Sequence, residues 1–93
     1  MNEQLQKFIE VGLHVEQAND LESMKEVLEA GSADYAAAVK AGMQELLAER
    51  PFSVGDWFSR TYVSFDDEDE LYSYLQDAYD YLFEGKGEPP EID

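Results

Sequence analysis

The chain has 93 residues, of which 22 are Asp or Glu and six are Lys or Arg, so its net charge is −16. Its 44% hydrophobic and 13% aromatic content separates it from acidic disordered tails, and its length allows one domain. The absence of cysteine excludes a disulfide framework and a thiolate metal site. A small domain needs a net charge of only about 2–8 in magnitude for solubility, so the excess charge indicates a basic partner.

Apolar residues at helical spacing predict three helices in the first half of the chain. The first spans residues 3–17, with an apolar stripe of Leu5, Phe8, Ile9, Val11, Leu13 and Val15. The second begins after Asn19 or Asp20, either of which can serve as its N-cap, and ends at Gly31. Its apolar positions are Leu21, Met24, Val27 and Leu28. The third spans residues 33–49, between an N-cap at Ser32 and Pro51.

The second half predicts a short helix, a connector and a long acidic helix. Ser53 and Asp56 have the spacing of a capping box, which opens a short helical turn with Trp57 and Phe58. Both aromatic residues are predicted to lie in the core, and the alternative for Trp57 is an exposed interface anchor. Four of residues 60–65 are β-branched or aromatic, namely Thr61, Tyr62, Val63 and Phe65, and we expect an extended connector because a lone strand forms no sheet. Asp66 is the predicted N-cap of a helix over residues 67–84, which ends at Gly85.

These elements predict an all-α fold, a small bundle of four main helices plus one short helix, with no substantial sheet. Residues 1–85 form a single acidic helical domain, and residues 86–93 form a polar C-terminal tail. The sequence has no signal-peptide pattern and no apolar run of about 18 residues, so we expect a cytoplasmic protein that does not enter a membrane. Its charge also disfavours direct contact with nucleic acid.

The acidic residues concentrate in the second half of the chain. Residues 51–93 hold twelve acids and two bases, a net charge of −10, whereas residues 1–50 have a net charge of −6. On the last helix, several carboxylates share a face away from the apolar one, and two tyrosines are expected between the faces. The predicted partner-binding residues are Asp66, Asp67, Asp69, Glu70, Tyr74, Asp77, Asp80, Tyr81 and Glu84. The alternative is a solvated helix face whose tyrosines complete the core edge.

No residue pattern predicts catalysis, a metal site or a cofactor. His14 is the single histidine, and Glu10 precedes it by four residues, so the Glu-x-x-His spacing of di-iron bundles is absent. In a calcium loop counted from Asp66, the sixth position would be Leu71 instead of glycine. The chain has no nucleophile motif and no phosphate-binding loop. We therefore expect a binding protein and not an enzyme.

A resemblance covers residues 51–84. Its motifs are Pro51-Phe52-Ser53, Asp56-Trp57, Phe65-Asp66-Asp67, Glu70-Leu71, Leu75 and Tyr81-Leu82-Phe83. This part of the chain resembles small acidic bacterial immunity proteins of the contact-dependent growth inhibition type. The resemblance implies a cytoplasmic protein that binds the catalytic domain of a toxin, often a nuclease, and blocks it. The first alternative is a DNA mimic from a phage or mobile element that inhibits a host defence or nucleic-acid-binding protein. The second is an acidic structural or adaptor subunit.

Overall fold

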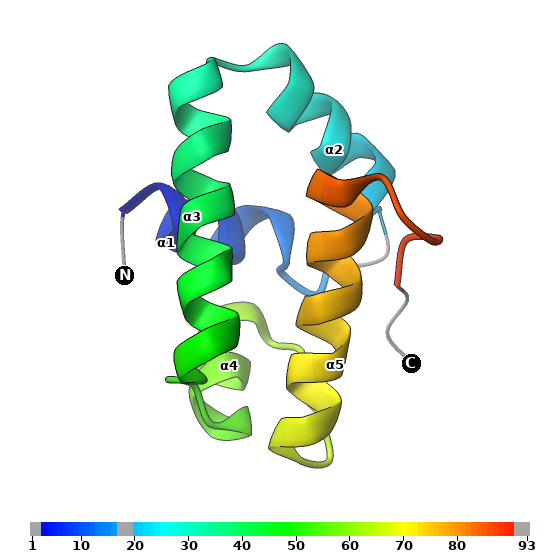
Figure 1. The fold of residues 1–93 in the computed structure, drawn as a ribbon. Coiled ribbons are helices and arrows are strands. Elements are labelled where there is room, and N and C mark those ends of the chain that lie inside the picture. Colours follow the sequence, from blue (N-terminus) through cyan, green and yellow to red (C-terminus); the bar gives the residue numbers. More distant parts are fainter. Residues whose placement is uncertain (1–2, 17–19, 91–93) are drawn as a thin grey trace.

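The computed structural model describes residues 3–16 and 20–90, and all regular structure in these ranges is helical. The elements are α1 (Glu3–Gly12), α2 (Leu21–Ala30), α3 (Ala33–Glu49), α4 (Val54–Thr61), α5 (Glu68–Tyr79) and the π-helical segment η1 (Asp80–Glu84). Figure 1 shows α3 and α5 side by side and antiparallel, with α4 near the end of α3 and the start of α5. The predicted all-α bundle is therefore confirmed.

The boundaries of α3 and the start of α4 follow the predicted local signals. The Tyr35 backbone N–H donates to Ser32 Oγ at 3.1 Å, so Ser32 is the N-cap of α3. At the other end, Arg50 takes a left-handed conformation and Pro51 follows. At α4, the Asp56 N–H donates to Ser53 Oγ, and the Ser53 N–H donates to the Asp56 carboxylate. The capping box is therefore complete.

Helix α1 ends at Gly12, so the prediction that it continues through residue 16 is wrong, and Gln17 lies outside the described residues. Gly12 lies against α2, where an added Cβ would be 2.7 Å from Met24 Cε. After the helix, the Val15 N–H donates to the Thr61 carbonyl at 2.8 Å, which fixes this segment against α4. Three valines predicted on apolar stripes are instead exposed: Val11, Val15 and Val27. Of the two predicted caps of α2, Asp20 makes no side-chain capping bond and Asn19 is not described.

Helix α4 is longer than predicted, because Arg60 and Thr61 belong to it and not to the connector. Thr61 ends the helix with its own hydroxyl, which donates to the Trp57 carbonyl at 2.9 Å and accepts from the Val63 N–H at 3.2 Å. Tyr62 then reverses the chain with φ of 60°. The extended connector is therefore shorter, residues 62–65, and these residues form no strand.

One apolar cluster joins all the helices. Trp57 is fully buried, and its ring meets the Phe52 ring edge-on at a centroid distance of 5.7 Å. This confirms the prediction that Trp57 belongs to the core. Phe58 is 47% exposed, so its predicted core position is wrong. The reason is the helical period: Trp57 and Thr61, four residues apart, occupy the inner face of α4, and Phe58 lies beside that face.

Candidate functional site

The predicted site begins at residues 66–70, hereafter the acidic turn, where α5 starts. The Glu70 N–H donates to Asp67 Oδ1 at 2.8 Å, so Asp67 is the N-cap, and the prediction of Asp66 is wrong by one residue. Asp66 contributes its backbone N–H, which donates to Glu70 Oε2 at 3.3 Å. Three exposed carboxylates also lie in the first turn of the helix, where the helix dipole favours negative charge. Part of the acidity predicted to bind a partner therefore also stabilises the start of α5.

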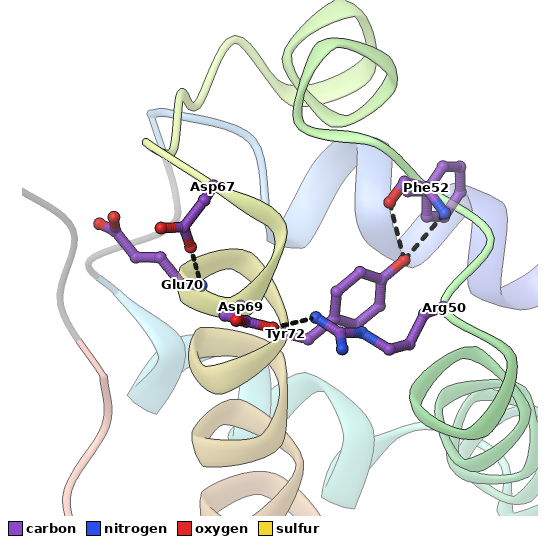
Figure 2. Close-up of polar contacts among 6 residues, drawn as sticks. All are labelled: Arg50, Phe52, Asp67, Asp69, Glu70 and Tyr72. Carbon is purple, nitrogen blue, oxygen red and sulfur yellow. Dashed lines mark hydrogen bonds and ion pairs between the residues drawn. The ribbon is translucent and has the colours of Figure 1, made fainter.

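Arg50 joins the acidic turn to the end of α3 (Figure 2). Its Nη2 lies 2.9 Å from Asp69 Oδ1, and its guanidinium lies over the Tyr72 ring, 4.7 Å from the ring centroid. Asp69 is 91% exposed, so this ion pair contributes about 0–1 kcal/mol. The arrangement fixes the position of Asp69 and lowers the net negative charge of the acidic turn.

The Tyr72 hydroxyl forms the buried part of the same contact. It accepts from the Phe52 N–H at 2.8 Å and donates to the Phe52 carbonyl at 3.0 Å (Figure 2). Burial raises the pKa of Tyr72, and the bond with the Phe52 backbone opposes this shift. Tyr72 thus holds the α3–α4 loop against α5, and its ring also contacts Arg50, which pairs with Asp69 of the acidic turn.

We expect Tyr72→Phe to lower the free energy of unfolding by about 1–3 kcal/mol, because it leaves two buried backbone groups of Phe52 unpaired. Tyr74→Phe is the matched control, since the buried Tyr74 hydroxyl has no hydrogen-bond partner among the described residues. That control should leave the stability unchanged or raise it. Urea unfolding followed by circular dichroism measures both effects. Equal losses in the two variants would contradict the assigned roles.

Tyr74, predicted to bind a partner from a position between the acidic and apolar faces, is instead buried. Its side chain is 6% exposed and packs against Phe65 at a ring-centroid distance of 5.4 Å. Burial raises the pKa of Tyr74 well above its usual value. Tyr74 therefore belongs to the core and offers no contact surface to a partner.

The other predicted carboxylates, Asp77, Asp80 and Glu84, are hereafter the acidic ridge. Asp77 and Glu84 are exposed, and Asp80 is half-buried and accepts from Gln76 Nε2 at 3.0 Å. The predicted single α-helix over residues 67–84 is wrong at this point, because residues 80–84 form a π-helical turn. In such a turn residue i bonds to residue i+5, so Glu84 is displaced from the row expected for a continuous α-helix. Gly85 ends the segment as predicted, with φ of 65°.

Tyr81 is half-buried between η1 and α2. The Lys25 ammonium lies over its ring, with Nζ 4.8 Å from the centroid. Partial burial and the negative charges of three α2 carboxylates, Glu22, Glu26 and Glu29, raise the pKa of Tyr81. These glutamates are functional candidates that the sequence reasoning missed. Their spacing of four and three residues was the available signal, since it places them on one helix face.

A second exposed feature is aromatic and lies at the end of α4. Phe58 and Tyr62 are four residues apart, with ring centroids 6.0 Å apart, and both are exposed. His14 packs edge-on against Tyr62 at 5.4 Å. The lone histidine is therefore a packing residue. Among residues 3–16 and 20–90, no group of three or more His, Asp or Glu side chains has the arrangement of a metal site.

Comparison with protein-family models, with curated proteins and with solved structures finds no match for this chain. In the described part of the chain, no helix is both long and apolar enough to cross a membrane.

Proposed function

We propose that the protein binds and neutralises a basic protein, and that this partner is the catalytic domain of a toxin, such as a nuclease. The observation that carries the proposal is the unneutralised charge. Against a net charge of −16, Asp69 is the one carboxylate in an ion pair among the described residues. Lys25, Arg50 and Arg60 are each placed over an aromatic ring. Most carboxylates are thus left to interact with solvent or with a partner.

A nuclease is the kind of target that such a surface fits. Its active-site cleft must attract phosphates, and it therefore presents positive charge. Carboxylates held on helices at fixed spacing can occupy the positions of those phosphates. The acidic turn, the acidic ridge and the outer face of α2 supply such carboxylates on neighbouring elements. The resemblance of residues 51–84 to immunity proteins of contact-dependent growth inhibition systems supports the same class of partner.

Association with the partner should be strongly salt-dependent. Raising the salt concentration from about 50 to about 500 mM should slow association by about one to two orders of magnitude and change the dissociation rate far less, because salt screens long-range attraction. The measurement is surface plasmon resonance with the catalytic domain of a nuclease toxin from the native host. An assay of its nuclease activity gives the second readout. An association rate that does not respond to salt would contradict the electrostatic basis of the proposal.

A capture experiment separates the proposed partner from other targets. The full chain is used to capture binding proteins from its native host at low salt, and mass spectrometry identifies them. If the toxin domain binds and loses activity, the immunity function is supported. Failure of the toxin domain to bind, with capture of a host DNA-binding protein instead, would reassign the chain as a DNA mimic.

A further inference from the structure

A small pocket at the C-terminal end of α3 is not used by the site described above. Its volume is about 130 Å³, and its walls are Gly42, Glu45, Leu46, Glu49, Pro51 and Phe52. Small-molecule sites usually measure about 300–1,000 Å³, whereas an apolar cavity of about 150 Å³ holds a single benzene ring. The pocket therefore has the size for one side chain and not for a cofactor.

The chemistry of the walls is apolar at the base and negative at the edge. Leu46 and Phe52 are buried core residues, and Glu45 and Glu49 are exposed one helical turn apart. Neither glutamate forms an ion pair with any described residue. Like charges at this spacing repel each other, and the carbonyl end of α3 adds further negative potential. A cation between the two carboxylates would relieve this repulsion.

The Phe52 ring already stacks with a guanidinium in this structure. The Arg60 guanidinium lies over that ring, 5.0 Å from its centroid, although Arg60 is not part of the pocket wall. Arg50 makes the same kind of contact with Tyr72 close by. A planar guanidinium holds several N–H donors in a fixed fork and can bind both pocket carboxylates at the same time, which a compact ammonium does less well. The walls therefore match arginine better than lysine.

We propose that this pocket receives an arginine side chain of the basic partner. The methylene stem lies against Leu46 and Pro51, and the guanidinium binds Glu45 and Glu49 at the pocket edge. The inference rests on the proposed function, since it requires a basic protein partner. The arginine pocket would extend the interface from α5 to the end of α3. It would also add a specific, short-range contact, whereas the other predicted contacts act mainly through long-range charge.

The test uses the ¹⁵N-labelled full chain and two blocked peptides of equal charge, one alternating glycine with arginine and one alternating glycine with lysine. The double variant Glu45→Gln/Glu49→Gln removes the pocket carboxylates. The control variant Glu10→Gln/Glu16→Gln removes the same charge from two exposed positions, one in α1 and one just after it. We expect the arginine peptide to shift the amide signals of residues 42–52. We also expect the pocket variant to weaken its binding about tenfold, and the control variant by no more than about twofold.

The outcomes separate this inference from the proposed function. Equal weakening by the two double variants, or equal binding of the two peptides to the wild-type chain, would overturn the arginine pocket and leave the acidic binding function standing. If neither peptide binds the wild-type chain at low salt, the result counts against the arginine pocket and against the acidic binding function. Loss of the shifts at residues 42–52 in the pocket variant alone supports the pocket.

Discussion

Trp57→Ala is expected to lower the free energy of unfolding by about 3–5 kcal/mol, which is a large part of the roughly 5–15 kcal/mol available to a small domain. Trp57 is the largest of the fully buried side chains, and it packs against Phe52. Its removal leaves a cavity where α4 meets the rest of the bundle. Guanidinium unfolding followed by far-ultraviolet circular dichroism, which reports the helix content, measures the loss.

The neighbouring residue provides the control. Phe58→Ala removes an aromatic ring of similar kind from the same helix, but from an exposed position. It should change the stability by about 0.5 kcal/mol or less. Trp57→Phe should be milder than Trp57→Ala, because the buried indole N–H has no hydrogen-bond partner among the described residues. If Phe58→Ala proves as damaging as Trp57→Ala, the inner and outer faces of α4 are assigned wrongly.

Local chemistry made several boundaries predictable. Ser32, Pro51 and Gly85 act within a few residues of their own position, and the observed ends of α3 and η1 agree with them. The capping box of Ser53 and Asp56 is likewise a contact between residues three apart. Such signals are contained in the sequence because no distant segment is needed to complete them.

The burial of aromatic residues depended on distant segments and was less predictable. Tyr74 lies at a helix position that the period places between the polar and apolar faces, and it is buried in a core that includes a ring contact with Phe65. The π-helical turn at residues 80–84 has no sequence signal that we recognise. The position of Phe58 is mispredicted because the sequence does not show that the helix includes Thr61, which shares the inner face with Trp57. Arg50 and Asp69 are 19 residues apart in the chain, so their ion pair could not be predicted without knowing the fold.

Neutralising the acidic ridge is expected to weaken partner binding mainly through the association rate. The variant Asp77→Asn/Asp80→Asn/Glu84→Gln keeps side-chain size, and the amide introduced in place of Asp80 retains an oxygen that can accept from Gln76. The fold should therefore persist, with stability unchanged or slightly raised by reduced repulsion. We expect about a tenfold slower association with the toxin domain at low salt. Tyr81→Ala should instead raise the dissociation rate by about tenfold, as loss of an aromatic anchor does.

The controls separate position from total charge. The variant Glu3→Gln/Glu10→Gln/Glu16→Gln removes three exposed carboxylates from the other end of the chain and should slow association less than the ridge variant does. The competing interface is the acidic turn, but Asp67 caps α5 and Asp69 pairs with Arg50, so changing them would disturb structure as well as charge. Asp66→Asn/Glu68→Gln tests that turn without removing the cap or the ion pair. If the ridge variant keeps its affinity within about twofold while Asp66→Asn/Glu68→Gln abolishes binding, the partner docks at the start of α5 and the ridge assignment is wrong.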